Sequence, residues 1–589
     1  MNNYNFIMKK LIVILLPIMV LSCSDLLDLN VDPKDRIPST VVWENEALIR
    51  ANLTDLYANF PDFAYDNMNW NYSDEATNRN GNSNAVTRGQ VSRTNDIPGF
   101  FDYSYIRQIN EFIENVSIAS IGDVAKTQMI AEARVIRAIV YFEMQKRYGG
   151  VPLVDVVLNP YEEIPESYLR RSTEEDIADF INIELQQASE MLNVSVEPRG
   201  QINKWVALAF KARANLFAAS IAKYGTVDLD GVVGIPASRI DDFYMQASAA
   251  AEEVIQSGVY TLYRNLLPDD PVENYRQIFI DQSNNEIIFE KVFNGVEIAH
   301  SFNNANSTPR FSVGEGATIN PLLEFVLGYE NIDGSIEEVP MGPDHLYEDG
   351  IDLFKNKDPR LRASIMLEGE TWVGHTMRLY DALDPHPQPN PGSNLSNILN
   401  HFSLSHNGVP AQGPDGKNLS NHFHTQSGFL IRKHLLDETF IVRNRDENNW
   451  IILRLAEMYL TKAEAEFELG NYEIAAIALN TTRERAGISL VDANSITLNH
   501  IRTERRSELA FEGHRYWDLR RWRIAEEVLS RGIPFQGLHT ILHYSSGQYY
   551  FMPYDAEVFT RSFGNQHYYN PITESRIENN PYLIENPGY

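Results

Sequence analysis

Between Ile451 and Ala486 the sequence has the spacing of two antiparallel helices joined by a short turn. Small side chains at Ala463 and Ala475 let two helix backbones approach closely, and the Gly470–Asn471 pair supplies the turn. Larger packing side chains stand at Tyr459, Tyr472 and Leu479. Because such a hairpin buries its apolar faces only against a neighbouring hairpin, this segment predicts an array of helices.

Two more segments have the same spacing, which is typical of the tetratricopeptide repeat. One starts at Trp205 and resumes at Tyr244, after a Gly- and Asp-rich stretch at 225–241 that is too long for a simple hairpin turn. The other pairs Met129–Tyr148 with Thr173–Leu192. We therefore expect three helical hairpins, one of them interrupted by a long loop.

The hairpin at 129–192 also carries signals for its helix ends. Gly149 and Gly150 end the first helix, and Pro152 beyond them prevents its continuation. Ser172 and Glu175 have the spacing of a capping box, in which the serine accepts from a free backbone N–H and the glutamate reaches back. The second helix is therefore expected to begin directly after Ser172.

The first twenty-three residues have the layout of an export signal. Lys9 and Lys10 precede an apolar run, Leu11–Leu21, that is about half of the ~20 residues a helix needs to cross a bilayer. The chain's single cysteine, Cys23, follows and is similar to the cysteine of a bacterial lipobox. This similarity implies cleavage before Cys23 and lipid attachment to it. Met8 is an alternative start, and a secreted signal with a chance cysteine is the alternative interpretation.

Length and charge exclude several classes of protein. The 589 residues exceed the ~250–300 at which one core usually stops growing, so two lobes or one extended array are expected. A net charge of −30 repels phosphate backbones and argues against nucleic acid as a partner. One cysteine excludes a disulfide framework and thiolate metal sites.

Between Asn265 and Asn449 helical periodicity fades, and Pro, Gly, Asn and His residues cluster. Such stretches are surface loops and short strands built on a scaffold. We expect ligand-binding residues there and in the polar, aromatic-bearing segment at 67–95.

The most specific motifs of the chain are Glu508–Gly513 and Arg515–Trp522. Further motifs lie at Ala131–Arg134, Arg147–Leu153, Leu455–Glu457, Met552–Pro553 and Asn586–Tyr589. In this order and spacing they resemble the SusD/RagB family, surface lipoproteins that capture nutrients beside a TonB-dependent outer-membrane transporter. The resemblance spans Cys23 to Tyr589.

The resemblance implies a mostly α fold, in which a tetratricopeptide-like helical-repeat scaffold carries a large loop-rich insertion containing short strands. It implies an outer-membrane protein anchored through lipid on Cys23 and facing outward, an oligosaccharide ligand, a SusC-like transporter as partner, and no cofactor. The expected regions are a signal peptide at 1–22, a lipidated tether at 23–40, an N-terminal helical region at 41–264, a ligand-binding lobe at 265–449 and a C-terminal region at 450–589.

Sugars are bound by flat aromatic rings together with amide, carboxylate and guanidinium groups. The segment at 70–79 offers all of these, and the corresponding early segment of SusD-like proteins contributes to their glycan site. The predicted ligand residues are Trp70, Asn71, Tyr72, Asp74, Glu75, Asn78 and Arg79, with a second group at Phe311, Tyr329, Trp372 and Tyr380. We expect Trp70→Ala to abolish binding with the fold intact. The alternative is that these rings pack inside the protein and the acids cap a helix.

Two other functions stay open. A glycosidase needs two carboxyl groups about 5–10 Å apart, and Asp74 with Glu75 or Glu315 is the pair on offer. Neighbouring side chains of an extended segment point to opposite faces, so binding is favoured over catalysis. A peptide ligand is the second alternative, because RagB-type relatives are associated with peptide uptake.

No catalytic or metal residue is predicted. Glu504, Glu508 and Glu512 alternate with arginines, which is typical of a solvated or paired helix face. The histidines lack the helical spacing of a metal pair with a nearby acid; they are His386, His401, His406, His422 and His424. Asp228–Gly231 lacks the glutamate that closes a calcium loop and is expected to form a turn.

Overall fold

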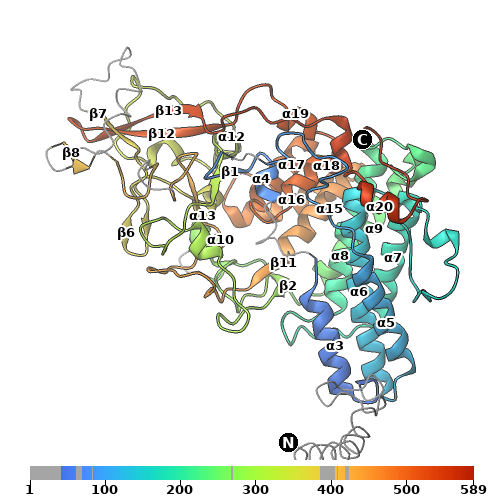
Figure 1. The fold of residues 1–589 in the computed structure, drawn as a ribbon. Coiled ribbons are helices and arrows are strands. Elements are labelled where there is room, and N and C mark those ends of the chain that lie inside the picture. Colours follow the sequence, from blue (N-terminus) through green and yellow to red (C-terminus); the bar gives the residue numbers. More distant parts are fainter. Residues whose placement is uncertain are drawn as a thin grey trace, which may run out of the picture.

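The computed structural model describes residues 42–61, 69–81, 84–266, 269–384, 405–406, 409–410, 412–417 and 423–589. The predicted signal peptide, the lipidation site at Cys23 and the tether up to residue 40 lie outside the described residues. Figure 1 shows a helical end, which contains α3 and α5 to α9, and an opposite end with β7, β12 and β13. Helices α15 to α18 lie between the two ends.

The helical end is an array of antiparallel hairpins. Its pairs are α6 (Asp123–Tyr148) with α7 (Glu174–Met191), α8 (Lys204–Tyr224) with α9 (Ile240–Gln256), and α15 (Leu455–Glu468) with α16 (Tyr472–Ala486). Helix α7 also packs on α8, and α9 packs on α15, so the array continues across the whole loop-rich stretch of sequence. The predicted tetratricopeptide-like scaffold is therefore confirmed. Before it come α3 (Glu46–Ala58) and α5 (Tyr103–Ile118), which pack on α6.

The ends of α6 and α7 are set by close backbone approaches. Gly149 has φ +76°, and a Cβ on Gly150 would lie 1.9 Å from the carbonyl oxygen of Ser172, so neither position accepts a larger residue. The capping box lies one residue later than predicted: the hydroxyl of Thr173 accepts from the N–H of Asp176 at 3.0 Å, and the carboxylate of Asp176 accepts from the N–H of Thr173. The N–H of Ser172 instead donates to Val151, which draws this residue out of the cap.

The expected start of the last hairpin at Ile451 is wrong. Residues Trp450–Arg454 form strand β11, which pairs antiparallel with β2 (Ile287–Lys291), and the helix begins only at Leu455. The run Trp-Ile-Ile-Leu is rich in residues that favour strands, and its burial on both faces hides any alternation. This strand pair joins the helical array to the loop-rich lobe.

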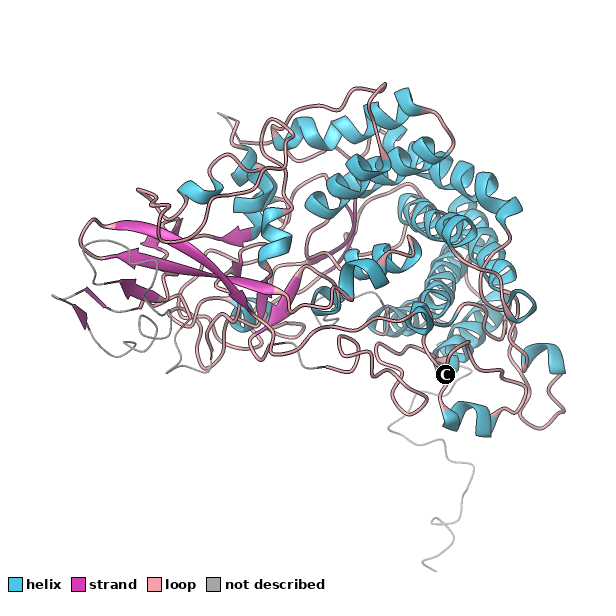
Figure 2. Cartoon of the chain, turned by 90° about the horizontal axis from the view of Figure 1, so that it is seen from above, coloured by secondary structure: helices cyan, strands magenta, loops and turns pink. Residues whose placement is uncertain are grey.

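The second lobe is built from short elements around its own core. Strand β12 (Gln536–His543) pairs antiparallel with β13 (Gln548–Asp555) and parallel with β7 (Ala382–Asp384), and β1 (Ala76–Asn78) pairs antiparallel with β3 (Ile319–Pro321). Figure 2 shows these strands at the end away from the long antiparallel helices, with short helices beside them. The other α-helices and strands of the whole molecule, in chain order, are α4 (Asn69–Tyr72), α10 (Pro271–Gln277), α11 (Phe302–Asn306), α12 (Leu323–Leu327), α13 (Pro359–Ser364), β4 (Ile365–Met366), β5 (Thr371–Trp372), β6 (His375–Thr376), β8 (Ser405–His406), β9 (Val409–Pro410), β10 (Leu430–Ile431), α17 (Leu498–Glu508), α18 (Arg515–Arg521), α19 (Ala525–Leu529) and α20 (Glu574–Asn579).

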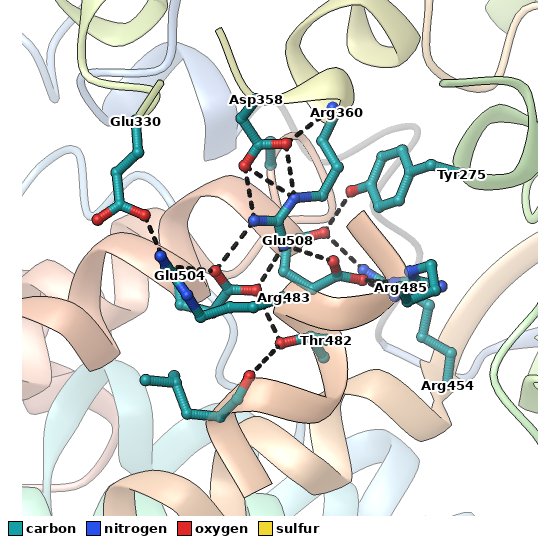
Figure 3. A network of polar contacts seen from close by, with 12 residues as sticks. Tyr275, Glu330, Asp358, Arg360, Arg454, Thr482, Arg483, Arg485, Glu504 and Glu508 are labelled. Carbon is teal, nitrogen blue, oxygen red and sulfur yellow. Dashed lines mark hydrogen bonds and ion pairs between the residues drawn. The ribbon is translucent and has the colours of Figure 1, made fainter. Parts of the chain in front are cut away.

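A buried network of ion pairs, the α17 network, ties the two lobes together (Figure 3). Glu504 accepts from Arg360 at 3.0 Å and from Thr482 at 2.7 Å. Glu508 accepts from Arg360 at 2.8 Å and from Arg454 at 2.6 Å, and both glutamate side chains have no exposed surface. Burial alone would raise the pKa of Glu508, but the surrounding arginines hold it far below its usual range.

The expectation of a paired face on this helix is confirmed, whereas a solvated face is wrong. The partners of Glu504 and Glu508 come from α13, β11 and α16, so the charges turn inward and none of them faces a cleft for catalysis. Within the described ranges, none of the helices combines the length and the apolar character that a membrane crossing requires.

Candidate ligand-binding site

The ring of Trp70 lies inside the core of the second lobe. Its side chain is 3% exposed and meets the ring of Phe302 edge-on, with 6.5 Å between the centroids. Asn71, the next residue, is also buried. A ring with both faces covered presents no platform to a sugar, so the position of Trp70 fits the packing alternative.

Asp74 and Glu75 are adjacent, and both are committed to internal partners. Asp74 accepts two bonds from the guanidinium of Arg515, at 2.7 and 2.9 Å. Burial would raise its pKa, but Arg515 outweighs burial and lowers the pKa of Asp74 to about 2. Glu75 accepts from the N–H of Phe511 at 2.8 Å, and burial raises its pKa to about 7.

The two carboxylates therefore hold this early segment to the turn after α17, through Phe511, and to the first residue of α18, Arg515. Phe511 has φ +57°, a left-handed conformation that is strained for a phenylalanine, and the bond from its N–H to Glu75 helps to fix it. Asp74 is 6% and Glu75 1% exposed, so little of either carboxylate is open to a glycosidic bond. The alternative prediction, that these acids cap a helix, is not what their contacts show: Asp74 pairs with the side chain of Arg515, and Glu75 accepts from the N–H of Phe511.

The four aromatic residues of the middle segment are also buried. Phe311 and Trp372 meet edge-to-face at 5.3 Å, and the indole N–H of Trp372 donates to Asp437 at 2.9 Å. Tyr329 packs against Phe325, and Tyr380 is 5% exposed. Short elements offer few regular apolar faces, so this lobe uses aromatic rings from its loops as core. Tyr72 is half-buried against Tyr516.

Asn78 and Arg79 reach the surface of the second lobe. Strand β1 pairs Asn78 with Ile319 and so brings the next residue, Arg79, beside the loop before β3. The guanidinium of Arg79 donates to the carbonyl of Gly316 at 2.9 Å and to Glu315 at 3.3 Å. It also lies over the ring of Phe423, 5.0 Å from the centroid.

Arg443 completes this group by pairing with the second oxygen of Glu315. We call Arg79, Glu315, Phe423 and Arg443 the Arg79 cluster. The exposed fractions of the side chains are 22% for Arg79, 15% for Glu315 and 66% for Arg443. Although burial would raise the pKa of Glu315, the hydrogen bonds and charges of Arg443 and Arg79 hold it below its usual range. The carboxylate therefore stays ionised as an acceptor between two donors.

The Arg79 cluster has the chemistry for a hydroxyl-rich ligand. Guanidinium groups donate in a fixed plane, an ionised carboxylate accepts from hydroxyl groups, and an aromatic ring covers C–H faces. Sequence reasoning named Arg79 as a ligand residue and Glu315 only as a partner in a glycosidase. Phe423 and Arg443 were missed because no local motif marks them and they meet Arg79 only through the fold.

Metal binding gains no support in the part of the chain that is described. It contains no group of three or more His, Cys, Asp or Glu side chains placed to hold an ion. His386, His401 and His422 lie outside the described residues. Asp228–Gly231 forms the predicted turn, with a 3-10 helix at Leu229–Gly231.

Comparisons with known proteins agree with this architecture. The model of the SusD family matches residues 285–589, just over half of the chain, and a family model described as starch-binding and associating with the outer membrane matches residues 26–216. A SusD-like protein of Bacteroides ovatus is 24% identical over 82% of this chain and 79% of its own length. A SusD-like protein of Formosa agariphila is also 24% identical, over 74% of this chain and 73% of its own.

Solved structures show the same fold over nearly the whole chain. A SusD-like protein of Bacteroides fragilis has a TM-score of 0.70 at 24% identity and covers 95% of this chain and 100% of its own. A SusD-like carbohydrate-binding protein of the same species has a TM-score of 0.69 at 23% identity, covering 92% of this chain and 100% of its own. Because the family model matches more than half of the sequence and the fold agrees, this chain belongs to the SusD/RagB family.

Proposed function

We propose that this protein binds oligosaccharide at the cell surface without cleaving it and passes it to a SusC-like TonB-dependent transporter. The Arg79 cluster is the observation that carries the proposal. It combines two guanidinium groups, one ionised carboxylate and one aromatic ring at the surface of the second lobe. Such a site needs only moderate affinity, because tethering beside a transporter supplies a high local concentration of ligand.

The descriptions of related proteins support this ligand class. One solved relative is described as a SusD-like carbohydrate-binding protein, and another is a laminarin-binding SusD-like protein with a TM-score of 0.59 at 18% identity, covering 93% of this chain and 100% of its own. The family model that matches the N-terminal third names starch and the outer membrane. On this basis we assign a glycan as the ligand of the Arg79 cluster.

The placement of the carboxylates supports binding over catalysis. Asp74 and Glu75 are buried against internal partners. Glu315 is ionised between two arginines, whereas the acid of a glycosidase needs a raised pKa to hold its proton. If reducing ends appear when the purified protein is incubated with a glycan, the protein is an enzyme and this part of the proposal fails.

Calorimetry with laminarin, soluble starch and a tryptic peptide mixture tests the ligand class. We expect one of the glycans to bind and both Arg79→Ala and Phe423→Ala to weaken that binding about tenfold or more. Arg107→Ala is the matched control, because Arg107 forms an exposed ion pair with Glu111 on α5, in the other lobe. Equal binding by Arg79→Ala and Arg107→Ala contradicts the site, and binding of peptides alone favours peptide uptake.

Two further experiments test the location and the partner. Radiolabelled palmitate should label the wild-type chain and not Cys23→Ala, because Cys23 is the predicted lipidation site. Gentle extraction of outer membranes should recover the protein together with a TonB-dependent transporter encoded beside it. Equal labelling of Cys23→Ala contradicts the anchor, and recovery of the protein alone contradicts the partner.

A further inference from the structure

A cavity lies on the helical side of the molecule, away from the Arg79 cluster. It has a volume of about 640 Å³. Three parts of the chain line it: the end of α8 and the loop that follows, helix α19, and the C-terminal segment. We call it the α19 pocket. Its lining consists of Tyr224, Thr226, Asp228, Val233, Arg523, Glu526, Glu527, Ser530, Asn565, Gln566, Tyr568, Tyr569 and Pro587. No residue of the Arg79 cluster contributes to it.

The wall of the α19 pocket is held rigid by an arginine between two tyrosines. The guanidinium of Arg523 lies 4.6 Å from the ring centroid of Tyr568 and 4.9 Å from that of Tyr569. Arg523 also donates to the hydroxyl of Tyr569 at 2.9 Å, and this hydroxyl donates to the buried Glu174 at 2.7 Å. Both rings are therefore fixed before any ligand arrives, which lowers the entropic cost of binding.

The backbone conformation at Arg523 would suit glycine better than arginine, which indicates that the arginine side chain itself has a role here. Arg523 follows α18 with φ +56°, the left-handed conformation that glycine adopts at no cost. An arginine at this position costs stability, and such strain is concentrated at functional sites. What the arginine adds over glycine is a planar donor seated on two aromatic rings inside a cavity.

The rest of the lining selects the class of ligand. Asp228, Glu526 and Glu527 are exposed carboxylates facing a single arginine, so the cavity repels phosphates and other anions. Amide and hydroxyl groups of Asn565, Gln566, Ser530 and Thr226 both donate and accept. A neutral molecule with many hydroxyl groups satisfies this mixture, and the half-buried rings of Tyr224 and Tyr569 are available to cover its C–H faces, whereas Tyr568 is buried against Arg523.

We propose that the α19 pocket is a second saccharide site, which takes a short neutral sugar or the end of a longer chain. Its volume lies within the ~300–1,000 Å³ of small-molecule sites. The inference borrows its ligand class from the proposed function but uses a different part of the fold. A second site would hold a long glycan at two points, so that the weak affinities of the two sites combine.

Saturation-transfer NMR of the full chain in detergent tests the α19 pocket, with maltose, cellobiose and laminaribiose as probes. We expect a signal from at least one disaccharide with the wild type and with Arg79→Ala. The double variant Glu527→Ala/Asn565→Ala should lose that signal at least fivefold. Both side chains are exposed, so the fold should be unaffected. Glu473→Ala, an exposed glutamate at the start of α16, is the control that should keep the signal.

Three results overturn the inference: no signal from any disaccharide with the wild type, an unchanged signal in the double variant, or a signal that Arg79→Ala alone removes. Calorimetry with polysaccharides distinguishes a failure of the proposed function from a failure of the α19 pocket alone. Failure of the proposed function removes glycan binding from the wild type altogether. Failure of the α19 pocket alone leaves polysaccharide binding and its dependence on Arg79 intact.

Discussion

The α17 network and the Arg79 cluster are built from the same chemical groups in different surroundings. In the α17 network Arg360, Glu504 and Glu508 have no exposed side-chain surface, and every charge is met by partners from other elements. In the Arg79 cluster the side chains are 15–66% exposed, and one aromatic ring lies beside them. Arginine and glutamate thus hold the lobes together in one place and face solvent in the other.

Burial decides which of the two roles a pair of charges takes. Removing one partner of a buried pair leaves the other charge unpaired in a medium of low dielectric constant, which costs about 3–5 kcal/mol. Exposed pairs are worth about 0–1 kcal/mol because water competes for both groups. A buried pair is therefore a poor site for a ligand, whereas an exposed pair gives up little when a ligand replaces water around it.

Arg360→Ala should have the largest effect. Arg360 donates to Asp358, Glu504 and Glu508, so its loss leaves three buried carboxylates without a common counter-charge. We expect unfolding in urea to show a loss of at least about 3–5 kcal/mol, or no soluble protein at all. Arg107→Ala, on the helical surface, is the control. A loss below about 1 kcal/mol would contradict the buried network.

Trp70→Ala compares a buried ring with the half-buried ring of Phe423. From sequence we expected this variant to lose ligand binding with its fold intact, but Trp70 is 3% exposed in the second core. Truncating a buried tryptophan typically costs about 3–5 kcal/mol. Thermal unfolding should show this loss for Trp70→Ala and a much smaller one for Phe423→Ala. Unchanged stability of Trp70→Ala combined with lost binding would restore the original expectation.

The scaffold could be predicted because its signals are local. Alanine spacing, Gly149 and Gly150 mark helices and their ends within a few residues of sequence. Errors arose where two local rules compete, as at Ile451, where an aliphatic run fits a strand or a buried helix, and at Thr173, which caps α7 in place of its neighbour. Ser172 and Thr173 are both good capping residues, and which of them caps α7 depends on where the backbone enters the helix.

The candidate site could be predicted only in part because it depends on distant contacts. An aromatic ring in an irregular segment looks the same in sequence whether it lies on the surface or, like Trp70, in the core. Arg79 was found from composition, whereas Phe423 and Arg443 reach it only through the fold of the second lobe. The partner of Asp74, Arg515, lies near the other end of the chain.

Glu75→Gln tests burial by its dependence on pH. The folded protein holds the proton of Glu75 up to a pH of about 7, whereas an unfolded chain loses it near the ordinary value of ~4.3. Between these values the folded state binds more protons, so Glu75 makes the wild type less stable as pH rises. Glutamine does not titrate. From about pH 5 to about pH 8 the stability of Glu75→Gln relative to the wild type should therefore rise, by on the order of 1–3 kcal/mol.

Urea unfolding of the wild type and Glu75→Gln at both pH values measures this difference. Glu473→Gln, at an exposed position, is the control and should track the wild type. A constant difference between Glu75→Gln and the wild type would mean that Glu75 ionises normally, in which case it is less buried than its contacts with Phe511 and Ser73 indicate.

Arg443→Ala should have the smallest effect on stability and yet change the Arg79 cluster. Arg443 is 66% exposed, so the midpoint of unfolding should stay where it is. Glu315 loses one of the two charges that lower its pKa, so this pKa should rise toward its usual value. Titration of the Glu315 carboxyl carbon by NMR measures the shift, with Arg107→Ala as the control.

The same variant shows whether an exposed pair is available to a ligand. Arg79 still holds Glu315 after Arg443 is removed, so the cluster keeps one guanidinium, its carboxylate and the ring of Phe423. Glycan affinity should therefore fall less in Arg443→Ala than in Arg79→Ala. A fall in stability instead would place Arg443 with the buried arginines of the α17 network. An unchanged pKa of Glu315 would mean that the two side chains do not meet in solution, and the outer half of the Arg79 cluster would then be lost as a binding surface.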